Sequence, residues 1–188
     1  MKIILIIFFF NMLIANEKYK EPSFSLIDKK DNIELRQYDE YVIARTSIPV
    51  NQSEEDNNMF RVLASYIFGR NEKNQSIPMT APVTTYKNND TYDMIFYMLD
   101  VNNIQELPNP SGQNISLEKF NLDKCAVISF SWFASENKIN KYTEKLKKYV
   151  NDNGYTVDSP FMVNRYDPPW TLPFLRRNEI LVQIDEGA

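Results

Sequence analysis

The sequence predicts a single α+β domain made of two similar halves, each a strand, a helix and two further strands. Three observations predict this class. Some segments alternate apolar and polar residues with the period of a half-buried strand, and two others have the period of an amphipathic helix. The same order then recurs at a constant offset of 85 residues, which separates Gly69 from Gly154. With 188 residues, 43% of them hydrophobic, the chain can build one well-packed core.

Residues 1–15 are predicted to be a signal peptide. Lys2 is followed by an apolar run over 3–14 that is broken only by one asparagine. About 12 apolar residues suit a signal-peptide core, whereas a membrane span needs about 20, so we expect no transmembrane segment. A buried first strand or an uncleaved anchor is the alternative interpretation. Polar residues 16–22 are predicted to be a flexible N-terminus, and 23–188 the folded domain.

A signal peptide predicts a protein that is secreted or held in the endomembrane lumen. Asn-x-Ser/Thr sequons, which predict a glycoprotein in that compartment, occur in expected loops or at element edges, at Asn51, Asn74, Asn89 and Asn114. The chain is rich in asparagine, so chance sequons are the alternative. Its one cysteine, Cys125, has no intramolecular partner and is expected to be a small buried hydrophobe rather than a reactive thiol.

In the first half, the strands are expected at Ile33–Tyr38, Tyr41–Ile48, Ile77–Tyr86 and Tyr92–Leu99. The helix is expected over Glu54–Phe68, after the capping residue Ser53 and before Gly69. Its apolar residues recur at helical spacing and predict one buried face, made of Met59, Val62, Leu63, Tyr66 and Ile67. Pro78 and Pro82 cannot donate to a strand ladder, so their segment is expected at an edge or corner.

The second half repeats this order, with strands expected at Ala126–Phe133, Phe161–Tyr166 and Glu179–Ile184. Its helix is expected to open at Ser135 and end at Gly154, with a solvated lysine-rich face. The repeats therefore span about 33–99 and 125–185, and imply pseudo-two-fold symmetry. The polar, turn-rich stretch Asp100–Lys124 is expected to be a loop between them.

Composition excludes several classes of function. The chain has no histidine, which rules out Ser-His-Asp and Cys-His catalysis, histidine-ligated zinc and a proximal-histidine haem. A single cysteine rules out a disulfide framework and an iron–sulfur site. A formal net charge of −4 without a basic block argues against nucleic acid as a partner.

Three stretches together resemble the SOUL haem-binding protein family. They are Ile33-Glu-Leu-Arg-Gln-Tyr leading into Val42-Ile-Ala-Arg-Thr, Ile77-Pro-Met-Thr-Ala-Pro-Val, and Tyr166-Asp-Pro-Pro-Trp-Thr-Leu-Pro-Phe-Leu-Arg-Arg-Asn-Glu-Ile. The resemblance covers about residues 23–186. It implies a distorted antiparallel β-barrel flanked by two helices, a tetrapyrrole ligand and no enzymatic activity.

The resemblance directs attention to a haem face on the first helix. The expected ligand-binding residues are Met59, Arg61, Val62, Leu63, Tyr66, Arg70 and Trp170, where apolar groups form a slot and arginines bind propionates. Without histidine, an axial ligand would have to be Met59, Tyr66, Met79 or Cys125. The alternative is that the helical stripe is only core. Arg176 and Arg177, near Glu179, are expected to form a structural ion-pair cluster, with propionate binding as the alternative.

Two hypotheses for function follow. The first is a secreted haem or tetrapyrrole carrier or buffer that binds weakly, without a histidine bond and without catalysis. The second is an interaction module, or a module for a small apolar ligand, that keeps the fold and ignores haem. A hydrolase that uses carboxylates is a third, more remote possibility, for which a buried glutamate with a raised pKa lining a pocket would be the sign.

Overall fold

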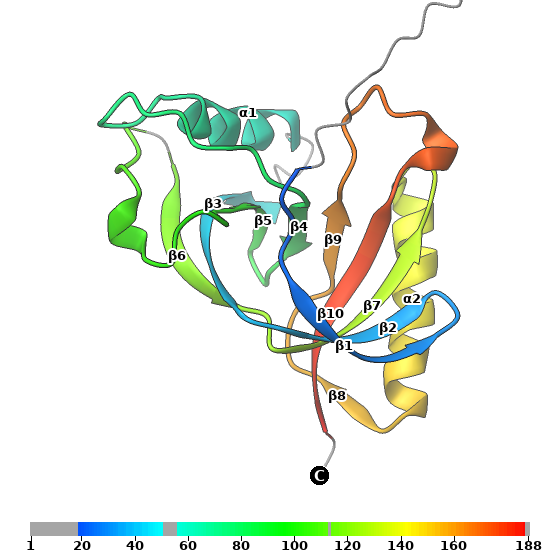
Figure 1. Cartoon of the computed structure of the whole chain (residues 1–188). Helices are drawn as coiled ribbons and strands as arrows, with labels where there is room; N and C mark the ends of the chain where they lie inside the picture. The colour runs from blue at the N-terminus through cyan, green and yellow to red at the C-terminus, as the bar shows by residue number, and fades with distance from the viewer. Residues whose placement is uncertain (1–18, 51–55, 113, 187–188) are drawn as a thin grey trace, which may run out of the picture.

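The computed structural model describes residues 19–50, 56–112 and 114–186. Within these ranges, a strongly curled antiparallel sheet forms a half-barrel that carries two helices (Figure 1). The predicted α+β class and the barrel-like antiparallel sheet with two helices are confirmed. The signal peptide predicted at 1–15 lies outside the described residues.

The strands of the described part are β1 (Phe24–Lys30), β2 (Ile33–Tyr38), β3 (Glu40–Pro49), β4 (Val83–Lys87), β5 (Thr91–Tyr97), β6 (Ser116–Asn121), β7 (Lys124–Phe130), β8 (Tyr155–Val157), β9 (Met162–Arg165) and β10 (Asn178–Glu186). The helices are α1 (Asp56–Ile67) and α2 (Glu136–Asp152), with short 3-10 turns η2 (Ile104–Glu106) and η3 (Pro173–Leu175). Nine strands follow the order β1-β2-β7-β10-β9-β4-β5-β3-β6, and β8 pairs with the end of β10.

The strand order is compatible with the predicted repeat. β3 pairs with β5 and β6, β7 pairs with β10 and β2, and the β4–β9 pair joins the two groups. Each helix follows the strand, β3 or β7, that lies between two partners. The pseudo-two-fold repeat of 33–99 and 125–185 itself stays a prediction.

The alternation of residues along the strands divides the core between the two faces of the sheet. On β3, Val42 and Ala44 pack with α1, whereas Ile43 joins a cluster on the inner face of the curl. The residues of β7 are divided in the same way, because Ile128 packs with α2 and Val127 belongs to the inner cluster. One sheet thus supports three apolar clusters, two of them closed by a helix.

Both helices end where the sequence predicts. Gly69 and Gly154 have φ angles of +105° and +74°, a left-handed conformation that glycine adopts without steric cost. Ser135 is the N-cap of α2, although its side chain makes no capping hydrogen bond. The predicted first residues of the other helix, including Ser53, lie outside the described residues.

Several predicted boundaries are wrong. The expected loop Asp100–Lys124 contains strand β6, and β1 occupies a stretch for which no strand was expected. Strand β4 begins only at Val83 because Pro82 precedes it, so most of the proline segment expected at an edge or corner lies outside the strands. Strand β7 ends at Phe130, since Trp132 has a φ of +76°.

No helix in the described residues is long and apolar enough to cross a membrane.

Candidate functional site

Three of the expected ligand-binding residues of α1 lie in the core. Met59 is 2% exposed, and Leu63 and Tyr66 are fully buried in the cluster between α1 and the sheet. The helical stripe that predicted a slot therefore packs against strand residues such as Phe96 and Met94. A planar ligand could reach these three side chains only if α1 separated from the sheet.

Two of the candidate axial ligands, Tyr66 and Cys125, already donate hydrogen bonds to backbone carbonyls. The hydroxyl of Tyr66 donates to the carbonyl of Pro108 at 2.8 Å, and burial raises the pKa of Tyr66 to about 12. The thiol of Cys125 donates to the carbonyl of Leu122 at 3.0 Å, and burial raises its pKa to about 12 as well. Met79 is half-buried against the cluster under α1. At neutral pH, the phenol and the thiol therefore stay protonated and bonded to backbone.

The remaining expected residues, and two that sequence reasoning missed, lie outside the fully buried face of α1. Arg61 is exposed and Val62 half-buried, and Arg70 is exposed just beyond the helix. Phe60 and Phe68, which were not predicted, are 40% and 70% exposed. We call Phe60, Arg61, Ala64 and Phe68 the α1 strip.

The α1 strip has a simple origin in the helical repeat. Phe60, Ala64 and Phe68 are four residues apart and so follow one side of the helix. Phe60 is anchored by an edge-on contact with the ring of Phe96, with 5.4 Å between the centroids. Two large aromatic side chains at the border of the apolar face of an amphipathic helix were the sequence signal that could have identified this strip.

Trp170 lies on a different element from the α1 strip. It belongs to the connection between β9 and β10, is 81% exposed, and is held between Pro169 and the short turn η3. This connection and α1 lie at the same end of the molecule, with the N-terminal segment between them (Figure 1). The structure therefore brings Arg61 and Val62 together on one helix and places Trp170 on a separate loop.

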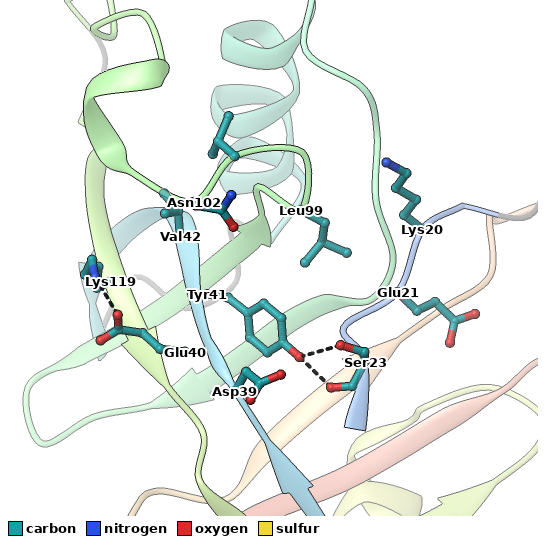
Figure 2. A pocket seen from close by; sticks show the side chains of 11 residues that line it. Lys20, Glu21, Ser23, Asp39, Glu40, Tyr41, Val42, Leu99, Asn102 and Lys119 are labelled. Carbon is teal, nitrogen blue, oxygen red and sulfur yellow. Dashed lines mark hydrogen bonds and ion pairs between the residues drawn. The ribbon is translucent and has the colours of Figure 1, made fainter. Parts of the chain in front are cut away.

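A pocket of about 390 Å³ opens beside the start of β3 (Figure 2). It is lined mainly by polar and charged side chains from the N-terminal segment, from β3 and β6 and from the loop after β5, namely Lys20, Glu21, Ser23, Asp39, Glu40, Tyr41, Val42, Leu99, Val101, Asn102 and Lys119. None of these residues was predicted to bind a ligand.

The charges around this pocket largely satisfy one another. Lys20 pairs with Asp100, Glu40 accepts a hydrogen bond of 2.6 Å from Lys119, and the hydroxyl of Tyr41 donates to the carbonyl of Ser23. Figure 2 shows the last two of these contacts across the pocket. A tetrapyrrole needs an apolar slot with available cations, so this pocket suits a small polar molecule better than haem.

The buried carboxylate of Glu179 belongs to an ion-pair network. It is 2% exposed, and both its oxygens accept hydrogen bonds of 3.0 Å from the guanidinium of Arg36. Tyr166 donates its hydroxyl to the same carboxylate at 2.6 Å. Because Glu179 is paired and lines neither described pocket, it lacks the features of a catalytic acid.

Arg177 forms a structural ion pair, as expected, but neither Arg176 nor Arg177 pairs directly with Glu179. Arg177 pairs with Glu21 and stacks on the ring of Tyr166, and Arg176 donates to the backbone carbonyls of Pro169 and Thr171. Sequence proximity suggested the wrong partner, because Arg36 comes from β2 and reaches Glu179 across β7.

Comparison with known families gives one match over most of the chain. A family described as "SOUL heme-binding protein" matches residues 19–183. No curated protein sequence is similar enough to the chain to count as a relative.

Solved structures with a similar fold are distant in sequence. A hydrolase from Listeria innocua is 10% identical, with a TM-score of 0.57 over 85% of this chain and 94% of that one. The C-terminal domain of EcmrR is 16% identical, with a TM-score of 0.60 over 82% and 97%. An EcmrR–DNA complex is 13% identical, with a TM-score of 0.64 over 83% of this chain and 57% of that one. At such identities the likeness concerns the fold alone.

Proposed function

Because the chain belongs to the SOUL heme-binding protein family, we propose that it binds haem or a related tetrapyrrole on the α1 strip, without a histidine bond. The observation that carries this proposal is the pair of exposed aromatic rings, Phe60 and Phe68, on the side of α1 that also presents Arg61. The family match supports the ligand class, and the strip supports the place.

The α1 strip has the chemistry that a tetrapyrrole needs. The flat apolar face of the macrocycle can cover Phe60 and Phe68, because Ala64 between them is 8% exposed and has no side chain that would hold the macrocycle away. Arg61 can bind a propionate, and no carboxylate of the described residues lies within ion-pair distance of it. Since the site is open to solvent and lacks an axial imidazole, binding is expected to be weak.

The test is a titration of the mature protein with hemin, followed by the Soret band. We expect a saturable change without the spectral features of bis-histidine ligation. Phe68→Ser should weaken binding on the order of tenfold, since a buried aromatic contact is worth about 1.5–3 kcal/mol and 1.4 kcal/mol is tenfold. Arg61→Gln should weaken binding by up to about fivefold, as an exposed ion pair contributes about 1 kcal/mol or less.

Variants elsewhere on the molecule test whether hemin binds at the α1 strip. Leu26→Ser removes a similarly exposed side chain on β1 and should leave the titration unchanged. Trp170→Ser tests whether the loop between β9 and β10 contributes, as the sequence predicts. Met59→Ala should lower stability without changing the hemin spectrum, because Met59 is buried. An unchanged Soret band in the wild-type protein would reject haem and favour a module for another small apolar ligand.

We further propose a carrier or buffer role without catalysis. The family is a heme-binding one, and the buried Glu179 is neutralised by Arg36. The distant fold relatives include proteins named as a hydrolase and as part of a DNA complex, but the net charge of −4 is the reason we expect no nucleic-acid partner here. Turnover of ester substrates by the wild-type protein would contradict the non-catalytic role.

Secretion and glycosylation complete the proposal. Asn74 and Asn89 are exposed in turns, so both can accept a glycan. Asn114 is also exposed, but its side-chain nitrogen donates to the carbonyl of Ser47 at 3.1 Å, which should lower its occupancy. Asn51 lies outside the described residues. Expression through a eukaryotic secretory pathway should yield a chain that begins after residue 15 and loses mass on deglycosylation.

A further inference from the structure

Two neighbouring loops lie at the end of the molecule where β7 leads into α2 (Figure 1). Both carry exposed apolar side chains. The loops are 131–135 and 166–177, and they are joined by hydrogen bonds: the N–H of Trp132 donates to the carbonyl of Pro173 at 2.9 Å, and Asn178 donates to the carbonyl of Trp132 at 2.8 Å. Their large apolar side chains are between 51% and 81% exposed, and we call them the loop surface: Trp132, Phe133, Trp170, Leu172, Phe174 and Leu175.

The loop surface is held by its own hydrogen bonds. The guanidinium of Arg176 donates to the carbonyls of Thr171 and Pro169, and the N–H of Arg177 donates to Asp167 at 2.6 Å. The turn η3 closes with a bond of 2.9 Å from the N–H of Leu175 to the carbonyl of Leu172. A braced loop that keeps large apolar side chains in water marks an interaction site, since these side chains do not stabilise the free protein.

Cations accompany these apolar side chains. The guanidinium of Arg176 lies 4.6 Å from the ring centroid of Phe133, and Lys138 lies 5.8 Å from that of Trp132. Arg176 also lines a pocket of about 290 Å³ with Arg165, Phe133, Ala134, Ser135, Asp167 and Asn178. In the described residues, no carboxylate lies within 4 Å of a charged nitrogen of Lys138, Arg165 or Arg176.

The local charge differs from that of the whole chain. The pocket is lined by two cations, Arg165 and Arg176, and one carboxylate, Asp167, and Glu136 and Lys138 add one charge of each sign in α2, whereas the chain as a whole has a net charge of −4. Aromatic and aliphatic side chains at loop ends, with arginine and lysine beside them, are the arrangement that anchors proteins at a lipid–water interface. Anionic headgroups supply the complementary charge.

We propose that the loop surface docks this protein on an anionic lipid membrane. The apolar side chains enter the boundary between headgroups and acyl chains, about 5–10 Å deep, and the pocket with Arg165 and Arg176 receives a lipid phosphate or carboxylate. Docking of this kind is peripheral and leaves the fold unchanged. It does not depend on the tetrapyrrole site, which lies on α1.

The chain carries its own probe for this docking. Its only two tryptophans, Trp132 and Trp170, both belong to the loop surface. Hemin-free protein is mixed with vesicles of phosphatidylcholine alone or with one-third phosphatidylserine, then sedimented, and its tryptophan emission is recorded. We expect co-sedimentation that rises at least fivefold with phosphatidylserine, a blue-shifted emission, and quenching by lipids brominated in the acyl chains.

Matched variants make the result specific. Trp170→Ser and Phe174→Ser should each reduce sedimentation at least fivefold, and Arg165→Gln should abolish the preference for phosphatidylserine. Phe68→Ser and Leu26→Ser remove equally exposed side chains elsewhere and should bind vesicles like the wild type. Absence of wild-type sedimentation, an equal loss in Phe68→Ser, or a concentration-dependent dimer that Trp170→Ser abolishes would overturn the proposal. Failure of hemin binding would leave this assay unaffected.

Discussion

At the scale of single residues, the buried ion pair of Arg36 and Glu179 carries a large desolvation cost. Their side chains are 5% and 2% exposed, so both charges have lost most of their hydration. Burial alone would lower the pKa of Arg36, but its hydrogen bonds and charge interaction with Glu179 raise that pKa above its ordinary value. Glu34 accepts a hydrogen bond of 2.8 Å from the Nε of Arg36, Tyr38 accepts one from its guanidinium, and Tyr166 donates to Glu179. The pair is stable because every member has a partner.

Breaking this pair from either side should destabilise the fold. Arg36→Met leaves Glu179 buried without a cation, and we expect a loss of about 3–5 kcal/mol in the free energy of unfolding. Glu179→Gln keeps the shape and leaves Arg36 paired with Glu34 at 2.7 Å, so we expect a smaller loss than for Arg36→Met. Denaturant titration followed by circular dichroism measures both.

The matched control is an exposed ion pair on α2. Lys148 and Asp152 are one helical turn apart, 2.8 Å between charged atoms, and in solvent. Lys148→Met should change stability by about 0.5 kcal/mol or less. Equal losses in Arg36→Met and Lys148→Met would show that burial does not set the cost.

At the scale of elements, the ends of the helices follow from single residues. Gly154 terminates α2 at a φ of +74°, and a β-carbon there would meet no atom within 4 Å. The cost of a side chain is therefore backbone strain alone. Gly154→Ala should destabilise the protein by about 1–2 kcal/mol, whereas asparagine, which tolerates this conformation better, should cost less. Thermal unfolding of both variants checks the order, and an alanine variant at least as stable as the wild type would contradict it.

The sequence predicts most accurately the elements whose apolar residues recur at regular spacing. Both helices were predicted because their apolar faces repeat over three or more turns and end at glycine. β1 and β6 were missed because they lie at the two ends of the strand order and are largely exposed, so their residues carry no clear apolar alternation. Ile77–Pro82 was wrongly assigned to a strand because its composition is apolar, although its prolines cannot complete a ladder.

The candidate site could be predicted only in part, for a related reason. Periodicity identifies residues that share a face, and on α1 that face is the core, so it selected Met59, Leu63 and Tyr66. Phe60 and Phe68 lie at the border of that buried face, beside Ala64, and are partly exposed, so the period of the buried face did not select them. The Arg36–Glu179 pair depends on which strands are neighbours, and that order is a tertiary property.

At the scale of the whole molecule, one curled sheet joins three apolar clusters into a single structure. Its inner face buries several hydroxyl and thiol groups, and burial raises the pKa values of Tyr38, Tyr97 and Cys125. The tyrosine between α1 and the sheet is affected in the same way, with the pKa of Tyr66 at about 12 instead of 10.0. These groups lie in all parts of the fold except the cluster under α2, so their ionisation affects the sheet as a whole.

Alkaline pH should therefore unfold the protein cooperatively. A group whose pKa is higher in the folded state contributes full stability below its unfolded pKa and loses it as pH rises toward the folded value. For Cys125 and Tyr66 the unfolded values are 9.0 and 10.0 and the folded values about 12, so stability should fall from about pH 9 to pH 12. We expect the tyrosinate absorbance of the buried tyrosines to appear together with the loss of circular dichroism.

Tyr66→Phe isolates one of these groups. The variant loses the hydrogen bond to Pro108 and should be less stable at neutral pH by about 1 kcal/mol. Between pH 10 and 12, however, its stability should fall less steeply, by up to about 1.4 kcal/mol per pH unit, because one fewer proton is released on unfolding. The two stability curves should thus converge as pH rises. Parallel curves would mean that Tyr66 ionises without unfolding, and that the contact between α1 and the sheet opens locally before the rest of the molecule.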